Sequence, residues 1–274
     1  MTTKKQLETM ELLSETEAYQ IYELPFERDG LRIYGEFYLP KNTDSYPTVL
    51  IGHPFGSSYQ WTASDAARFA EHGIAAYVFD FCGGSPNSKS DGAVTEMSVL
   101  TERDDMEAVL DGLRNCEFVD NENLFLMGES QGGFVAAMLA AKRPEDVKGL
   151  LLFYPALVIP DDARERYADM SQIPETSSIF GVSVGRIYYT DVFDMDPYAE
   201  ISGYQKDVLI VHGDQDGIVP ISYAERAAEE YASAELITIE GGGHGFYGEQ
   251  FDTANDAAIR YIQEHTDGGA DPAQ

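Results

Sequence analysis

The chain of 274 residues is 43% hydrophobic and carries 18 basic against 48 acidic residues, which gives a formal net charge of −30. This length fits one large α/β domain with a sizeable core, and the negative field would repel nucleic acid and anionic membranes as partners. The first residues contain no apolar stretch like that of a signal peptide, and no apolar run approaches membrane-spanning length. The two cysteines, Cys82 and Cys116, show no metal-like spacing. The sequence therefore predicts a cytoplasmic protein with reduced thiols.

The first predicted element is a β-hairpin over residues 18–40. Two runs of alternating hydrophobic and polar residues, 20–24 and 31–38, flank Asp29-Gly30, and Asp-Gly is a strong turn signal. Beyond the hairpin, strand-like and helix-like runs alternate. Strands are predicted at 48–52, 74–80, 123–127, 147–154, 208–212 and 235–239, and helices at 63–72, 98–114, 131–142, 221–231 and 251–264.

These later strands are mostly continuous apolar runs, as expected when helices cover both faces of a sheet. An antiparallel start followed by alternating strands and helices predicts the α/β class, with a mostly parallel, doubly wound sheet of eight strands. Residues 156–206, after the sixth strand, are too many for a simple crossover. We expect them to form a lid subdomain inserted into a core of residues 1–155 and 207–266, although a solvated elaboration without a role is the alternative. The tail, 267–274, is predicted to be disordered.

The most informative motif is Gly128-Glu129-Ser130-Gln131-Gly132, which fits the G-x-S-x-G pattern of a nucleophile elbow. An apolar run, 123–127, precedes it and a helix-forming run, 134–141, follows it. This strand–turn–helix setting would lift the Ser130 hydroxyl clear of the sheet and place it at a helix N-terminus. The alternative is an accidental turn of small residues, so the hypothesis depends on finding partners for the serine.

A serine hydroxyl needs a histidine to remove its proton, and the histidine needs a carboxylate to fix its tautomer. His244 lies in a glycine-rich loop, 241–245, after the last predicted strand, and it follows both other candidates in the order Ser, Asp, His. We interpret it as the base. The other four histidines occupy strand ends, a helix end or the polar tail: His53, His72, His212 and His265.

Two carboxylates, Asp214 and Asp216, follow the penultimate strand and are alternatives for the acid. Asp216 is favoured, with Asp214 as a turn former and His212 in a structural role. For the oxyanion, one N–H donor is expected from Gln131 and the other from Phe55, because Pro54 has no N–H to give. The alternative is that the Phe55 loop is an ordinary strand-to-helix connection.

In their motifs and order, Ser130, Asp216 and His244 resemble the α/β-hydrolase superfamily, over residues 20–265. The elbow, the His53-Pro54-Phe55-Gly56 loop and the insert resemble bacterial cinnamoyl (feruloyl) esterases more narrowly. In that family the elbow reads Gly-His-Ser-Gln-Gly-Gly, so Glu129 stands in place of a histidine, and Pro54 interrupts the usual His-Gly-Phe. The resemblance implies that a lid aspartate and a lid tyrosine hold the ring hydroxyls of a hydroxycinnamate. These correspond to Asp162 and Tyr188, with Asp161 and Tyr189 as alternatives.

The sequence thus predicts a serine carboxylic-ester hydrolase that acts through an acyl-enzyme on small hydroxycinnamoyl or short-acyl esters. No metal or organic cofactor is expected, and the only predicted partner is the small-molecule ester; formation of a homodimer is left open. Two alternatives remain. One is a serine peptidase resembling prolyl-oligopeptidase relatives, and the other is a non-catalytic protein of this fold that serves in binding.

Overall fold

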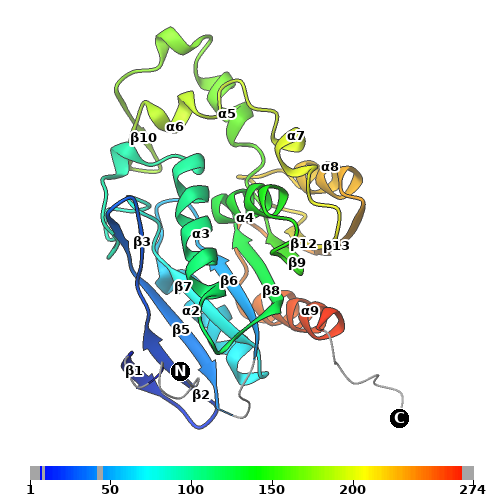
Figure 1. Cartoon of the computed structure of the whole chain (residues 1–274). Coiled ribbons are helices and arrows are strands. Elements are labelled where there is room, and N and C mark those ends of the chain that lie inside the picture. Colours follow the sequence, from blue (N-terminus) through cyan, green and yellow to red (C-terminus); the bar gives the residue numbers. More distant parts are fainter. Residues whose placement is uncertain (1–6, 8–9, 42–45, 267–274) are drawn as a thin grey trace.

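The computed structural model describes residues 7, 10–41 and 46–266, and within these ranges a nine-stranded sheet forms the centre of the molecule (Figure 1). The strand order is β1-β2-β5-β7-β6-β8-β9-β12-β13. From β7 onward all neighbouring strands are parallel, whereas β1, β2 and β5 are antiparallel to their neighbours. The strands are β1 (Glu11–Glu15), β2 (Tyr19–Glu23), β5 (Gly35–Pro40), β6 (Tyr46–Gly52), β7 (Ala75–Phe79), β8 (Val119–Glu129), β9 (Gly149–Phe153), β12 (Asp207–Gly213) and β13 (Ser233–Ile239).

The predicted hairpin is present as β2 and β5, which pair from Tyr19 with Pro40 to Glu23 with Glu36. Between them β3 (Phe26–Arg28) and β4 (Leu31–Ile33) form a small ladder of their own around Asp29-Gly30. Both turn residues have positive φ, 52° and 83°, as a tight hairpin turn requires. The prediction of eight strands was one short because β1 also joins the sheet. All five residues of β1 are exposed, so no alternation of buried and exposed residues marked it in the sequence.

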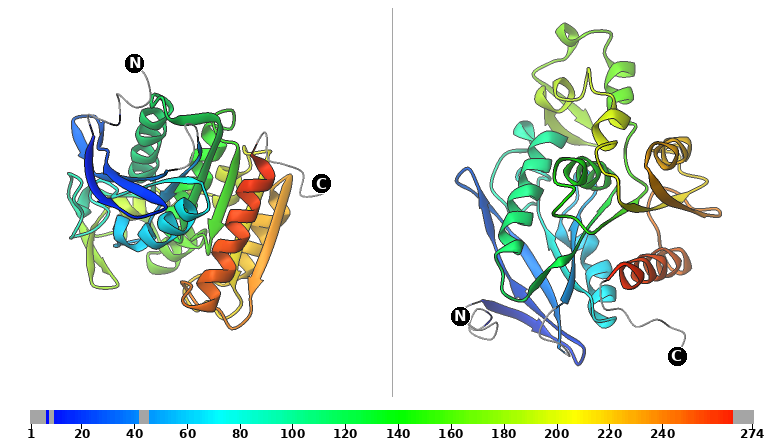
Figure 2. Two further views of the ribbon diagram at one scale, coloured as in Figure 1. Left: turned by 90° about the horizontal axis from the view of Figure 1, so that it is seen from below. Right: turned by 45° about the vertical axis from the view of Figure 1, so that its right-hand side comes forward.

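Helices cover both faces of the sheet (Figure 2). On one face, α3 (Val99–Arg114), α4 (Gln131–Lys142) and α8 (Ser222–Glu230) bury their apolar side chains in one core cluster. On the other face, α2 (Tyr59–Glu71) and α9 (Glu249–His265) pack over a second cluster. Helix α4 is buried from Gln131 to Ala140. The helix that starts at the predicted elbow is therefore held rigidly between the sheet and its neighbours.

The expected insert leaves the sheet after β9 and returns to it at β12, and it lies above the other elements in Figure 1. It contains α5 (Ile159–Arg166), the hairpin of β10 (Thr176–Ile179) and β11 (Val182–Gly185), α6 (Ile187–Thr190) and α7 (Pro197–Ile201). Hydrogen bonds tie it to the core: the Ser98 hydroxyl donates to Asp191, and the Tyr188 hydroxyl donates to Gln131. We call residues 156–206 the lid segment below; the division into core and lid stays a prediction.

The tail that was predicted to be disordered, 267–274, lies outside the described residues. Over the ranges that the structure describes, none of the helices is both long and apolar enough to span a membrane.

Candidate active site

Ser130 occupies the sharp turn between β8 and α4, with φ of 52° and ψ of −118°. Positive φ is costly for a residue other than glycine and persists only where the surroundings enforce it. Here the Ser130 N–H donates to the carbonyl of Phe153 at 2.9 Å, and the Ser130 carbonyl accepts from the amide of Ala156 at 2.9 Å. The end of β9 therefore fixes the strained turn from both sides.

The two glycines of the motif allow strand and helix to approach each other. A Cβ on Gly128 would lie 2.1 Å from the carbonyl oxygen of Gly132, and one on Gly132 would lie 2.4 Å from the carbonyl oxygen of Gly52. Both obstacles are backbone atoms, which cannot rotate away as a flexible side chain can. The small residues of the G-x-S-x-G motif are thus required by close packing at this crossing.

The structure joins Ser130, His244 and Asp216 in one chain of hydrogen bonds. His244 Nε2 lies 2.8 Å from Ser130 Oγ, and His244 Nδ1 lies 2.7 Å from Asp216 Oδ2. The three residues come from three separate loops: the turn after β8, the loop after β12 and the loop after β13. Since the sheet is parallel in this region, the carboxyl ends of these strands meet at one edge, where such sites form.

Asp216 is held as a carboxylate by its surroundings. Its Oδ1 accepts from the amides of Ile218 and Val219, at 2.8 and 2.9 Å. Burial alone would raise the pKa of Asp216, but hydrogen bonds from His212, His244 and these two amides outweigh it and hold the pKa well below its usual range. A carboxylate that remains ionised can accept the N–H of His244 and stabilise its protonated form.

Asp214 and His212, both close to Asp216 in the chain, make hydrogen bonds to backbone groups. Asp214 is exposed, and its Oδ1 accepts from the amide of Gly241 at 2.7 Å, which joins the loops after β12 and β13. His212 is fully buried, and its Nε2 lies 2.9 Å from the carbonyl oxygen of Val219. Neither residue reaches Ser130 through a hydrogen bond recorded in the described chain.

Phe55 and Gln131 line the same pocket as Ser130. Gln131 is the first residue of α4, so its N–H has no carbonyl partner within the helix and is available to an oxyanion. Buried His53 shapes the Phe55 loop: its Nε2 accepts from the amide of Phe81, and its Nδ1 lies 2.7 Å from the carbonyl oxygen of Pro54. Burial lowers the pKa of His53, so the neutral ring makes both contacts.

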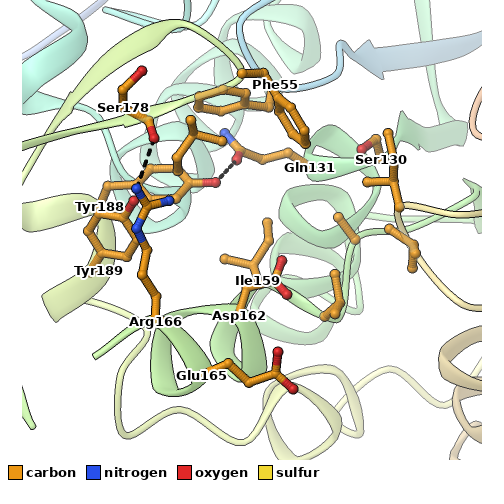
Figure 3. Close-up of a pocket in the computed structure, with 17 residues that line it drawn as sticks. Phe55, Ser130, Gln131, Ile159, Asp162, Glu165, Arg166, Ser178, Tyr188 and Tyr189 are labelled. Atoms are coloured by element: carbon orange, nitrogen blue, oxygen red, sulfur yellow. Dashed lines mark hydrogen bonds between the residues drawn. The ribbon is translucent and has the colours of Figure 1, made fainter. Parts of the chain in front are cut away.

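A pocket of about 510 Å³ extends from Ser130 beneath the lid segment (Figure 3). Phe55, Ile159 and the rings of Tyr188 and Tyr189 line it together with polar side chains of α5, namely Asp162, Glu165 and Arg166. Burial, followed by the charges of Glu165 and Asp161, raises the pKa of Asp162. Asp161 is engaged elsewhere, because its carboxylate accepts from Tyr223 and Arg164, both at 2.7 Å.

The hydroxyl of Tyr188 contacts the side chain of Gln131, a connection that the sequence did not predict. It donates to Gln131 Oε1 at 2.8 Å, and Gln131 Nε2 donates to Glu102 Oε2 at 2.7 Å. Burial raises the pKa of Glu102 well above its usual value. The adjacent Tyr189 instead directs its hydroxyl to Ser177 Oγ, at 3.4 Å. These contacts link residues far apart in the chain, so no local motif signals them.

This fold and this hydrogen-bonded serine, histidine and aspartate define an α/β hydrolase. The family model described as serine aminopeptidase, S33, matches residues 44–187, more than half of the chain, and the chain therefore belongs to this family. A second family model, described as TAP-like protein, matches residues 191–271.

Esterases are among the similar proteins. Caffeoylshikimate esterase from Arabidopsis thaliana is 27% identical over 154 residues, which make up 53% of this chain and only 44% of that protein. The structure of Est1E from Butyrivibrio proteoclasticus with ferulic acid bound matches with a TM-score of 0.81 and 25% identity, over 88% of this chain and 98% of that one. The acetyl xylan esterase from Paenibacillus sp. R4 matches with a TM-score of 0.71 and 18% identity, over 94% and 88% of the two chains, and shows the fold alone.

Proposed function

We propose that this α/β hydrolase is a serine carboxylic-ester hydrolase that works through an acyl-enzyme. The observation that carries the proposal is the position of His244, which contacts Ser130 Oγ on one side and Asp216 on the other. In this mechanism His244 takes the proton of Ser130 as its Oγ attacks the ester carbonyl carbon. The protonated His244, stabilised by Asp216, then donates that proton to the departing alcohol.

The second half of the reaction uses the same residues with water in place of the alcohol. His244 deprotonates a water molecule, which attacks the acyl carbon and releases the acid, and Ser130 regains its proton. In both halves the carbonyl oxygen becomes an oxyanion. We assign the backbone N–H groups of Phe55 and Gln131 as its donors, because both residues line the pocket together with Ser130.

The substrate class that we propose is small esters with a hydroxycinnamoyl or a short acyl group. The pocket of about 510 Å³ next to Ser130 has room for an aromatic acid. Its wall combines the rings of Phe55 and Tyr188 with the carboxylate of Asp162. We assign Asp162 and Tyr188 to the ring hydroxyls of the acyl group. The ferulic acid in Est1E and the name of the plant esterase support this choice.

Hydrolysis of methyl ferulate and methyl acetate at matched concentrations tests this function, because the two esters share the methanol leaving group and differ only in the acyl group. We expect turnover of both esters, with kcat/KM for methyl ferulate higher by roughly tenfold or more, the size of a few added pocket contacts. A higher kcat/KM for the acetyl ester would indicate an esterase for short acyl groups. An absence of turnover with any ester would contradict the proposed function.

A serine peptidase is the second candidate, and the description of the matched family favours it. The same serine and histidine chemistry cleaves amides, so the active-site geometry alone does not separate the two activities. Aminoacyl p-nitroanilides, tested beside the esters, do separate them. We expect slow or absent cleavage of the anilides, whereas anilide turnover equal to ester turnover would favour the peptidase. A cytoplasmic location remains a prediction from the sequence, which leaves formation of a homodimer open.

A further inference from the structure

A second pocket, of about 230 Å³, lies between α2, α9 and the loop after β13. Its walls include Trp61, Tyr154, Phe246 and two acidic residues, Asp65 and Glu129. Each acidic residue is only 3% exposed. Buried carboxyl groups are costly unless they are paired or protonated. Glu129 directly precedes Ser130, so the protonation of Asp65 and Glu129 bears on the active site.

The contacts of Glu129 come from neutral donors. Its Oε2 accepts from Trp61 Nε1 at 2.7 Å and from the hydroxyl of Tyr154. The carboxyl of Asp65, on α2, interacts with that of Glu129, and Asp65 Oδ1 accepts from Asn255 Nδ2 of α9 at 2.9 Å. No ion pair to either carboxyl is recorded among the described residues. Two buried carboxylates that line one small pocket repel each other, so one shared proton is the stable arrangement.

Tyr154 connects this pair to the active site. Its ring packs against the imidazole of His244 in an edge-to-face arrangement, with ring centroids 4.9 Å apart. The same ring also packs against Phe246, with ring centroids 5.0 Å apart. The Tyr154 N–H donates to the carbonyl of Val211 at 2.8 Å. The ring is therefore fixed by its backbone, by Phe246 and by the hydrogen bond from its hydroxyl to Glu129.

We propose that Glu129 is a positioning residue for His244, which it orients by holding Tyr154 against the imidazole while sharing one proton with Asp65. This inference rests on the proposed esterase function. The shared proton leaves Glu129 Oε2 free to accept from Trp61 and Tyr154, while the protonated oxygen donates to Asp65. Burial, and then the charge of Asp65, raises the pKa of Glu129 well above its usual value, and burial raises the pKa of Asp65 to about 6.

The titratable groups that face Glu129 are Asp65 from α2 and Tyr154 after β9, with His244 beyond Tyr154. The fluorescence of Trp61 can report on this group directly, because Trp61 is the single tryptophan of the chain and its indole contacts Glu129. We expect its emission to change with pH in the wild type, with a midpoint well above the usual pKa of a glutamate, because burial and then the charge of Asp65 raise the pKa of Glu129. Asp65→Asn should move this transition by more than about one pH unit. An unchanged transition in that variant would overturn the shared proton.

Activity tests the positioning role. Glu129→Ala should lower kcat for p-nitrophenyl acetate by roughly tenfold or more, because a small misplacement of a catalytic group is costly, and should leave KM within about twofold. Glu129→Gln should restore most of the lost kcat. Its amide oxygen can accept from Trp61 and Tyr154, and its amide nitrogen can donate to Asp65. Unchanged kcat in Glu129→Ala, or no rescue by glutamine, would overturn the role.

Glu36→Ala is the matched control. Glu36 is also a buried glutamate that accepts from a tyrosine, the Tyr34 hydroxyl at 2.6 Å, but it lies on β5, away from β8 in the sheet. It should lose stability and keep kcat; an equal loss of kcat would show a general effect of lost stability and overturn the role of Glu129. If Glu129→Ala does not fold, Tyr154→Phe provides the test, because it keeps the ring and removes its contact to Glu129. Its kcat should fall by about threefold or more, and an unchanged kcat would overturn the proposal.

Different results would contradict the esterase function and the role of Glu129. A wild-type protein that hydrolyses no ester contradicts the function, while the fluorescence titration still decides whether Asp65 and Glu129 share a proton. An active wild type with an unaffected Glu129→Ala variant contradicts the positioning role alone.

Discussion

The hydroxyl of Tyr188, in the lid segment, donates to the side-chain oxygen of Gln131, the residue that follows Ser130, over 2.8 Å. This contact joins the wall of the pocket to the start of α4, whose first N–H we assign to the oxyanion. A hydroxyl that donates one hydrogen bond retains lone pairs that can accept another. Tyr188 can therefore hold Gln131 and a substrate hydroxyl together, and its removal should affect both.

Tyr188→Phe should lower kcat/KM for methyl ferulate by about tenfold or more, because a hydrogen bond to the acyl group and the support of Gln131 are both lost. The acetyl group of p-nitrophenyl acetate is too short to reach this wall. The kcat/KM for this ester should fall by about threefold or less, because only the support of Gln131 is lost. Steady-state kinetics on both esters check this prediction.

Tyr189→Phe serves as the comparison for that variant. The Tyr189 hydroxyl is directed toward Ser177, at 3.4 Å, which is a weak contact. We expect changes within about twofold on both esters. If kcat/KM of Tyr188→Phe falls equally for the two esters and the variant melts at a lower temperature, Tyr188 is a packing residue. Its proposed role in recognising the acyl group would then be wrong.

Asp216→Asn should be far more damaging than Asp214→Asn. The amides of Ile218 and Val219 would hold the oxygen of the asparagine, so its NH2 group would face His244 Nδ1 and force the opposite tautomer. This type of loss can approach ~10⁴ in rate. Asp214 accepts from Gly241 in an exposed turn, so its substitution should lower stability slightly and keep most of the activity. Rates and melting temperatures of both variants decide the assignment, and the reverse pattern would make Asp214 the catalytic acid.

The meeting of Ser130, Asp216 and His244 was predictable because each follows a strand of a parallel sheet. Strand ends converge on one edge, so chain order and a local motif were enough to predict which side chains meet there. The contact of Tyr188 with Gln131 was not predictable in this way. The helices and strands of the lid segment are short, and its side chains are placed by tertiary packing.

Strand β1 and the partner of Glu129 also could not be predicted from the sequence. Strand β1 has no buried face, so its pairing with β2 left no pattern to read. The departure of Glu129 from the resembled elbow was visible, but its partner Asp65 lies on α2, far away in the chain, and carries no motif. Contacts between distant residues of this kind follow from the assembled fold and not from local propensity.

Gly132→Ala should strongly destabilise the protein. The added Cβ would lie 2.4 Å from the backbone oxygen of Gly52, so β6 and α4 would have to move apart, at a cost of about 3 kcal/mol or more. Gly217→Ala is the matched control in an active-site loop, because a Cβ there meets no atom within 4 Å. Urea unfolding of the two variants measures the difference. Equal stability would contradict the close crossing of strand and helix.

The stability of the protein should depend on pH through Asp216. Its folded-state pKa is lowered, because hydrogen bonds from His212, His244 and two amides outweigh the effect of burial. A carboxyl of this kind stabilises the fold above its unfolded pKa of about 4, and this contribution is lost as the pH falls toward the folded value. The free energy of unfolding should therefore fall less steeply with acidification in Asp216→Asn than in the wild type. Parallel pH curves from urea unfolding would contradict the lowered pKa.

Reaction with a fluorophosphonate, followed by peptide mass spectrometry, identifies the residue that forms the covalent intermediate, which we assign as Ser130. We predict one adduct, on the peptide that carries Ser130, with parallel loss of p-nitrophenyl acetate hydrolysis. Ser130→Ala should fold normally, remain unlabelled and lose several orders of magnitude in kcat. A label on another residue, or a Ser130→Ala variant that retains most of its activity, would contradict the assignment of Ser130 as the nucleophile.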